Sequence, residues 1–159
     1  MSLKLAQQVL DLAREAGIKV AAAESCTGGL VMAALTELAG ASDVVDRGFI
    51  TYSNAAKAEM LGVAPELIAA QGAVSQAVAQ AMAEGALANS NAGLAVSITG
   101  IAGPGGGSAD KPVGLVWFAL ARTGGATISV EKRFTQPGRA GIRAASVETA
   151  LELLKDALA

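Results

Sequence analysis

Residues 20–31 are VAAAESCTGGLV, and this stretch decides the fold. A short apolar run without turn residues ends abruptly in hydroxyl, thiol and glycine residues, and an apolar periodic segment follows. That order predicts a buried strand over residues 19–24, a tight turn, and a helix over residues 27–38 whose N-terminus is open to a ligand. Ser25 or Thr27 is expected to cap this helix, because a side-chain oxygen there accepts an unpaired amide of the first turn.

Two glycines stand at the start of this predicted helix. Gly28 and Gly29 let another group approach the backbone closely, although each costs about 1 kcal/mol of helix propensity relative to alanine. The free amides and the positive end of the helix would favour an anion or a developing oxyanion. Taken alone, the stretch is also compatible with small residues chosen for packing.

The same pattern recurs in residues 93–107, GLAVSITGIAGPGGG. A second buried strand is predicted to end at Thr99 and to break into glycines, among them Gly100 and Gly103. In open α/β sheets, ligands lie beyond the carboxyl ends of such strands, and glycine loops there can hold phosphate with backbone amides. Neither loop matches the dinucleotide fingerprint or the P-loop pattern. Two such loops nevertheless predict a pocket.

The remaining elements follow from periodicity and turn residues. Further helices are predicted over residues 3–16, 55–61, 65–69, 76–88 and 139–158, and further strands over residues 44–52, 93–99, 113–121 and 127–134. A hairpin turn at residues 123–125 predicts antiparallel pairing of the last two strands. Early alternation and a late hairpin predict a three-layer α/β/α sandwich on a mixed sheet, as one domain over residues 1–159.

Composition narrows the class of protein. Hydrophobic residues make up 52% of the chain but aromatic residues only 3%, so Ala, Val, Leu and Gly are expected to build the core. The net charge of −2 is scattered, without the basic stripe of a nucleic-acid-binding protein. No apolar run reaches membrane-spanning length, and no signal peptide is evident. A single cysteine, Cys26, excludes an intrachain disulfide and favours a cytoplasmic location.

The chain contains no histidine. Ser-His-Asp and Cys-His catalysis within the chain are therefore excluded, and so are histidine-based metal sites. Acid–base work must fall to Lys, Tyr, Asp, Glu or a thiol, and neither a metal nor a cofactor is expected.

Residues 51–57, TYSNAAK, supply a candidate general base. If a helix begins near Ser53 or Asn54, Lys57 lies one turn in and shares a face with them. A lysine in a partly buried pocket can have a lowered pKa and take a proton from a serine such as Ser25. The alternative is a solvated helix lysine, which spacing alone favours.

Other candidates carry alternatives of their own. Tyr52, the only tyrosine, can relay a proton, bind substrate or pack on the core. Arg139 and Arg143 lie one helical turn apart and can hold a phosphate together, or can be surface charges. Cys26 can be a nucleophile with a pKa lowered by a helix N-terminus, or simply a small residue in the turn. Trp117 is expected in the core.

Four motifs occur in order along the chain: AAESCTGG at residues 22–29, TYSNAAK at 51–57, SITGIAGPGG at 97–106 and GRAGIR at 138–143. Together they resemble the CinA C-terminal domain family. The resemblance runs over nearly the whole chain. It implies the activity of the family's stand-alone nicotinamide-nucleotide amidases, which hydrolyse the carboxamide of nicotinamide mononucleotide to nicotinate mononucleotide and ammonia.

The resemblance also implies roles for individual residues. The family's serine, tyrosine, lysine, threonine and arginine fall on Ser25, Tyr52, Lys57, Thr99 and Arg139. Ser25 is then the nucleophile, with Lys57 and Tyr52 as its base, and Thr99 also belongs to the catalytic group. Arg139 and the loop after Thr99 are expected to bind the nucleotide phosphate.

Backbone groups complete the expected site. Thr27, Gly28 and Gly29 in the first loop, and Gly100 and Gly103 in the second, are expected to contact substrate or hold the oxyanion.

A competing hypothesis is a nucleotide-binding module without turnover, acting in competence or DNA-damage responses. The expected partner is a small molecule rather than nucleic acid or a membrane. From the family and the Ala-rich helices, we also expect a homodimer or a larger homo-oligomer.

Overall fold

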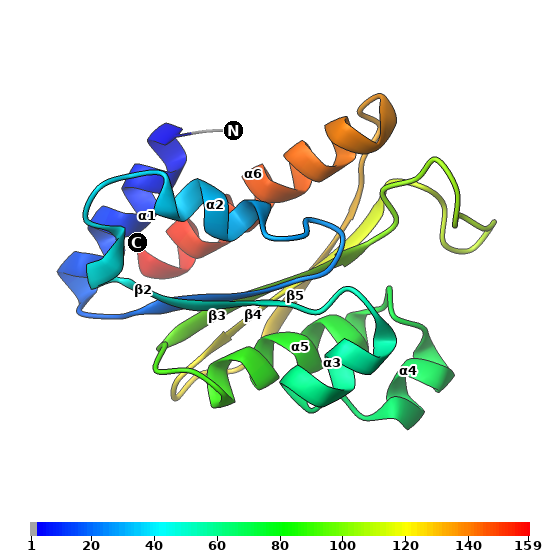
Figure 1. Cartoon of the computed structure of the whole chain (residues 1–159), viewed down its shortest axis with the longest axis horizontal. Coiled ribbons are helices and arrows are strands. Elements are labelled where there is room, and N and C mark those ends of the chain that lie inside the picture. The colour runs from blue at the N-terminus through cyan, green and yellow to red at the C-terminus, as the bar shows by residue number, and fades with distance from the viewer. Residues whose placement is uncertain (1–2) are drawn as a thin grey trace.

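The computed structural model describes residues 3–159 and has five strands between two layers of helices (Figure 1). The strands are β1 Val20–Glu24, β2 Val45–Ile50, β3 Leu94–Gly100, β4 Leu115–Arg122 and β5 Ile128–Arg133. The helices are α1 Leu3–Ala16, α2 Leu30–Thr36, α3 Asn54–Leu61, α4 Pro65–Gln71, α5 Gln76–Ala88 and α6 Gly138–Leu158, with a short 3₁₀ turn at Ala41–Asp43.

The sheet has the strand order β2-β1-β3-β4-β5. Strand β1 is parallel to both β2 and β3, whereas the β3–β4 and β4–β5 pairs are antiparallel. The predicted mixed sheet and late hairpin are therefore confirmed. Every residue of β1 is buried, as is all of β3 except its last residue, because helices cover both faces of these inner strands.

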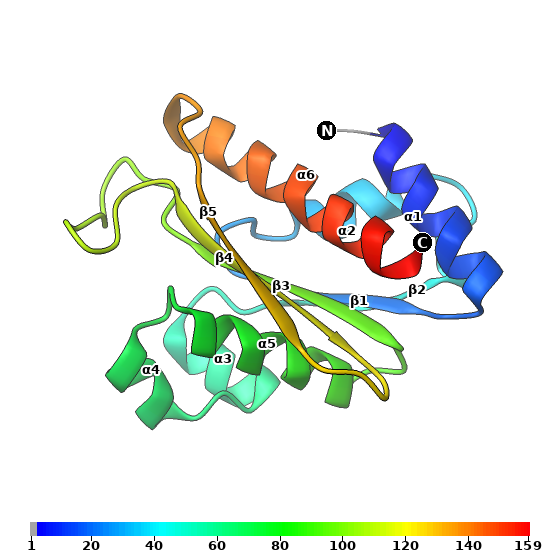
Figure 2. The same ribbon diagram turned by 180° about the vertical axis from the view of Figure 1, so that it is seen from behind.

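Helices α1, α2 and α6 cover one face of the sheet, and α3, α4 and α5 cover the other (Figures 1 and 2). The predicted three-layer α/β/α sandwich is confirmed. No helix within residues 3–159 combines the length and the apolar character needed to cross a membrane.

Small residues let the helical layers approach the sheet closely. Ala79 and Ala83 of α5 pack on Ala119 and Ala121 of β4 in one buried cluster. A Cβ atom on Gly85 would collide with the backbone carbonyl of Leu61, so α3 and α5 touch through their backbones. The predicted core of small aliphatic residues is thus observed, and it brings α3 close to the sheet edge.

Helix α2 begins differently from the prediction. It starts at Leu30 rather than Thr27, and its N-cap is Gly29 (φ 107°), with no side chain of the turn capping it. The fully buried carboxylate of Glu24 instead accepts hydrogen bonds from the amides of Gly29 (3.2 Å), Val31 (3.0 Å) and Met32 (3.1 Å).

The expectation of an open helix N-terminus is therefore wrong. A buried carboxylate needs hydrogen-bond donors, and the start of α2 supplies three of them together with the positive end of its dipole. Glu24 lies outside the usual capping position, so sequence spacing gave no sign of this arrangement.

Candidate active site

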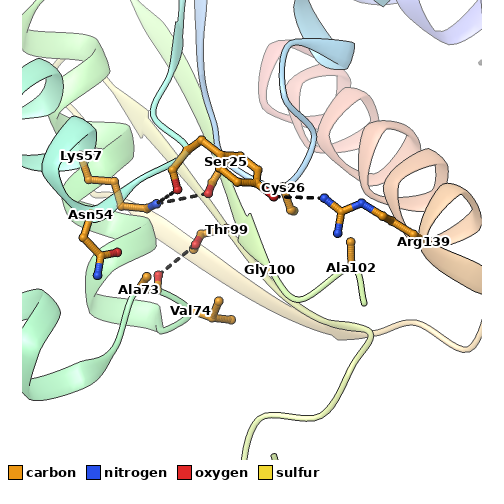
Figure 3. Close-up of a pocket in the computed structure, with 11 residues that line it drawn as sticks. Ser25, Cys26, Asn54, Lys57, Ala73, Val74, Thr99, Gly100, Ala102 and Arg139 are labelled. Atoms are coloured by element: carbon orange, nitrogen blue, oxygen red, sulfur yellow. Dashed lines mark hydrogen bonds between the residues drawn. The ribbon is translucent and has the colours of Figure 1, made fainter. Parts of the chain in front are cut away.

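The two predicted loops meet at one edge of the sheet. Strands β1 and β3 are parallel neighbours, with Glu24 opposite Ile98, so Ser25, just after β1, lies beside Thr99 near the end of β3. A pocket of about 230 Å³ opens there (Figure 3). Its lining residues are Ser25, Cys26, Tyr52, Asn54, Lys57, Ala73, Val74, Thr99, Gly100, Ala102 and Arg139.

Helix α3 delivers Lys57 to this pocket. The Ser53 hydroxyl caps the helix by accepting the amide of Ala56 at 3.0 Å, which fixes where the helix begins. Lys57 is only 1% exposed, and its Nζ lies 3.2 Å from Ser25 Oγ (Figure 3). The alternative of a solvated helix lysine is wrong, because the close approach of α3 to the sheet edge buries this side chain.

The surroundings of Lys57 favour its neutral form. Burial lowers the pKa of the amine, since a desolvated ammonium is costly. Nζ also donates to the backbone carbonyls of Thr51 (3.0 Å) and Tyr52 (3.2 Å). A neutral amine has two hydrogens, and two carbonyls can take both of them. In this structure Nζ also donates to Ser25 Oγ, and once the amine is neutral its lone pair can turn to Ser25 and accept the hydroxyl proton.

Tyr52 and Arg139 form the outer part of the pocket. Tyr52 is 61% exposed, so its alternative of packing on the core is wrong. Arg139 donates from Nη2 to the Tyr52 hydroxyl at 3.0 Å and from Nη1 to the Gly103 carbonyl at 2.8 Å. This guanidinium connects helix α6, the glycine loop and the segment between β2 and α3. Within residues 3–159, Tyr52 reaches Lys57 only through its backbone carbonyl.

Thr99 shapes the wall opposite Lys57. Its buried hydroxyl donates to the carbonyl of Ala73 at 2.9 Å, which fixes the segment between α4 and α5 against the end of β3. Gly100 follows in the lining, and a Cβ atom there would collide with the side chain of Val116. The second loop therefore needs glycine at this position for packing as well as for access.

The first loop faces the pocket only through Ser25 and Cys26. Thr27, Gly28 and Gly29 are not among the lining residues. The Gly28 amide donates to the Ser25 carbonyl at 3.1 Å and so closes a tight turn. The buried Thr27 hydroxyl finds no hydrogen-bond partner in residues 3–159.

Arg143 does not pair with Arg139 in the pocket. Its Nε donates to the Cys26 carbonyl at 3.0 Å and its Nη2 to the Thr27 carbonyl at 3.2 Å. The alternative of two arginines sharing a phosphate is therefore wrong. The turn carbonyls lie closer to Arg143 and take its donors.

Cys26 carries a buried thiol that is less acidic than a free one. Burial raises its pKa to about 11, because a thiolate in this apolar setting is poorly solvated. The helix start that was expected to stabilise a thiolate is occupied by the Glu24 carboxylate. The alternative of a small residue packed in the turn is the one that fits. Trp117, the other core candidate, is half-buried and packs against the alanine cluster between α5 and β4.

Some lining residues were not predicted. Asn54, the first residue of α3, lies beside Lys57 on the helix face that the spacing predicted, but it was not named as a site residue (Figure 3). Ala73, Val74 and Ala102 come from loops and carry no chemical signal in the sequence. Nowhere in residues 3–159 do three His, Cys, Asp or Glu side chains gather as a metal site would require.

The fold and the site define a class of protein: a three-layer α/β sandwich with a buried serine–lysine pair at the carboxyl ends of parallel strands. The model of the CinA C-terminal domain matches residues 2–158. The chain belongs to the CinA C-terminal domain family, as the four motifs predicted.

Curated relatives and solved structures agree with this assignment. Nicotinamide-nucleotide amidohydrolase PncC of Escherichia coli K12 is 47% identical over 152 residues, covering 96% of this chain and 92% of that protein. A CinA-like protein of Mycolicibacterium vanbaalenii is 54% identical over 144 residues, covering 90% of this chain. The chain spans only about a third of that longer relative, 34% of its length.

Among solved structures, the competence/damage inducible protein CihA of Agrobacterium tumefaciens superposes with a TM-score of 0.95 at 53% identity. The match covers 98% of this chain and 94% of that one.

Proposed function

We propose that this chain is a nicotinamide-nucleotide amidase that hydrolyses the carboxamide of nicotinamide mononucleotide. The observation that carries the proposal is the 3.2 Å contact between Lys57 Nζ and Ser25 Oγ, in a setting that favours the neutral amine. A serine next to a neutral lysine is an activated nucleophile that needs no histidine. The similarity to the Escherichia coli amidohydrolase over 96% of the chain supports the choice of substrate.

The first half of the reaction forms an acyl-enzyme. Ser25 Oγ attacks the carboxamide carbon while its proton passes to Lys57 Nζ, and a tetrahedral oxyanion results. The C–N bond then breaks, and Lys57 returns the proton to the leaving nitrogen, which departs as ammonia. Ser25 is left as an ester of nicotinate mononucleotide.

The second half hydrolyses this ester. Lys57, neutral again, takes a proton from a water molecule as the water oxygen attacks the ester carbon. Collapse of the second tetrahedral intermediate breaks the bond to Ser25 Oγ, which recovers the proton from Lys57. Nicotinate mononucleotide is released, and both residues return to their starting protonation states.

The oxyanion would be held by a backbone amide of the first loop. The amides of Gly28 and Gly29 already donate to Ser25 and Glu24, and Thr27 is fully buried outside the lining, which leaves the amide of Cys26. A donor aimed at a developing oxyanion contributes about 3–4 kcal/mol of transition-state stabilisation. Gly28 and Gly29 then support the substrate indirectly, by shaping the turn.

The nucleotide part would lie toward the outer end of the pocket. Arg139 keeps N–H groups beyond those bound to Tyr52 and Gly103, and its charge suits a phosphate. Gly100 lines the pocket and leaves the backbone accessible there, whereas Gly103 is buried and supports Arg139 through its carbonyl. The exposed ring of Tyr52 would contact the substrate, and Thr99 would hold the wall that faces it.

The test is ammonia release from nicotinamide mononucleotide by the unaltered protein beside its Lys57→Met variant, which keeps an unbranched side chain as far as Cε but removes the amine. We expect release by the unaltered protein and a loss of at least about 100-fold in the variant, since a general base contributes about 10²–10⁴. Binding of the nucleotide without ammonia release would contradict the amidase and favour the binding module.

A further inference from the structure

The side-chain amide of Asn54 lines the pocket without a partner. Asn54 is exposed, and no hydrogen bond within residues 3–159 uses its side-chain carbonyl or its NH₂ group. Other polar side chains of the lining do have partners in the same part of the chain, namely Ser25, Tyr52, Lys57, Thr99 and Arg139. The amide of Asn54, with one acceptor oxygen and two N–H donors, is therefore free to bind a substrate.

The local structure of α3 does not explain an asparagine at this position. Asn54 is the first residue of the helix, but the helix is capped by Ser53, whose hydroxyl accepts the amide of Ala56 at 3.0 Å. Asparagine is a poorer helix former than alanine, and this one gains no hydrogen bond to the backbone of α3 among the described residues. Its polar group is thus exposed to the pocket without serving the helix.

Asn54 lies one helical turn before the proposed base. Residues three apart share a helix face, with Cβ atoms about 5–6 Å apart, and the Asn54 amide lies beside Lys57 on the same wall of the pocket (Figure 3). In the proposed reaction, Lys57 Nζ returns its proton to the leaving nitrogen, so this nitrogen must come within hydrogen-bond reach of Nζ. A carboxamide placed in this way brings its NH₂ group toward the helix face that carries Asn54.

We propose that Asn54 binds the NH₂ group of the substrate carboxamide, with its Oδ1 accepting a hydrogen bond from the nitrogen that leaves as ammonia. This inference rests on the proposed amidase reaction and adds recognition of the scissile amide to it. One N–H held by Oδ1 restricts rotation of the nitrogen, so its lone pair in the tetrahedral intermediate can be kept toward Lys57. The carboxylate of the product has no N–H to donate, so the same contact favours the amide over the acid.

The experiment compares two substrates that differ in the leaving atom, nicotinamide mononucleotide and the methyl ester of nicotinate mononucleotide. Both yield nicotinate mononucleotide, which is measured in the same way, but the leaving oxygen of the ester carries no hydrogen for Oδ1 to accept. We expect Asn54→Ala to lower kcat/KM for the amide by about 5- to 10-fold, as the loss of one neutral hydrogen bond should. For the ester, kcat/KM should stay within about twofold of that of the unaltered protein.

Asn91→Ala is the matched control. Asn91 is also an exposed asparagine, but it precedes β3 and so lies at the opposite end of that strand from the pocket. This substitution should leave kcat/KM unchanged for both substrates.

Asn54→Asp tests where the side chain lies. A carboxylate beside Lys57 favours the ammonium, so the pKa of Lys57 should rise and the rising limb of the kcat/KM profile should move to higher pH. The other ionisable side chains of the lining, Cys26, Tyr52 and Arg139, are the same in both proteins. An acidic residue in the first turn of a helix is stabilising, so this variant should fold even if Asn54→Ala does not.

Three outcomes would overturn the inference while leaving the amidase in place. They are equal losses for amide and ester in Asn54→Ala, unchanged amide hydrolysis in that variant, and a rising limb of Asn54→Asp at the pH of the unaltered protein. If the unaltered protein forms no nicotinate mononucleotide from the amide, the proposed reaction itself is overturned, and this inference with it, whether or not the ester is hydrolysed.

Discussion

Lys57 shows how burial changes the acid–base behaviour of a residue type that is usually exposed. It is 1% exposed and forms no ion pair with a carboxylate in residues 3–159. A buried ammonium without a counter-ion is costly, so burial lowers the pKa of Lys57 and shifts the side chain toward the neutral amine. The backbone carbonyls of Thr51 and Tyr52 hold that amine against Ser25. At the residue scale, the site therefore depends on protonation.

The pH dependence of ammonia release tests this protonation state. Only the neutral amine can accept the Ser25 proton, so kcat/KM should rise with pH as Lys57 loses its proton. Burial lowers the pKa of Lys57, and the rising limb should lie below the ordinary lysine value of about 10.4. A pH–rate profile measures this directly. A rising limb near the ordinary lysine value, or activity that falls as pH increases, would contradict the assignment.

The reactivity of Cys26 provides an independent check on the same loop. Because burial raises its thiol pKa to about 11, the native protein should react slowly with an aromatic disulfide reagent at pH 8. Protein unfolded in urea should react at the rate of a free thiol and serves as the control. Equal rates for native and unfolded protein would show that the thiol is neither buried nor weakly acidic.

At this scale the sequence predicted which residues belong to the site better than it predicted their burial and their contacts. Spacing placed Lys57 one turn into a helix. Its buried position, however, includes a contact with Ser25, which is 32 residues away in the chain. No local pattern carries that information. The same limit applies to Arg143, whose partners Cys26 and Thr27 lie more than a hundred residues away, at separations of 117 and 116.

At the scale of elements, the start of α2 shows a helix cap that local capping rules do not predict. The order and type of the major helices and strands followed from periodicity and turn residues, and α1, α5 and the hairpin agree closely with expectation. The cap of α2 did not, because Glu24 reaches it from the preceding strand. A capping rule considers the residues at the helix start, whereas this cap results from a buried carboxylate that needs three donors.

Glu24→Gln should destabilise the fold through this cap. The neutral amide keeps one acceptor oxygen, so buried amides of α2 lose a charged partner and one NH₂ group must be accommodated there. We expect the free energy of unfolding to fall by about 1–3 kcal/mol, measured by urea denaturation. Glu37→Gln at the exposed C-terminal end of the same helix is the matched control and should change it by less than about 0.5 kcal/mol. Equal effects of the two substitutions would contradict the role given to Glu24.

The contact between α3 and α5 links packing to the site. A Cβ atom on Gly85 would meet the Leu61 carbonyl, so Gly85→Ala must push α3 outward. We expect this to cost about 1–3 kcal/mol of stability and to lower kcat, because Lys57 belongs to the displaced helix. Urea denaturation and ammonia release measure the two effects. Gly105→Ala, which places its Cβ in open space, is the control for stability, and an equally stable Gly85→Ala would contradict the packing account.

At the scale of the whole molecule, the pocket is assembled from both helical layers and the sheet between them. Ser25 follows β1, Lys57 comes from α3 on one face, and Arg139 comes from α6 on the other (Figures 1 and 3). The three-layer architecture was predictable because alternating strands and helices, with buried inner strands, admit few arrangements. For the pocket, the sequence predicted the location, which is the end of the sheet where two strands run into glycine loops. It did not predict the full set of lining residues.

The most direct test of the central claim, that Ser25 is the nucleophile of an amidase, is ammonia release from nicotinamide mononucleotide by Ser25→Ala beside the unaltered protein. The change removes one hydroxyl at the wall of the pocket and should leave the urea unfolding midpoint nearly unchanged. We predict that the unaltered protein releases ammonia and that the folded variant falls to the rate of buffer alone. Comparable release by the folded variant would contradict the claim.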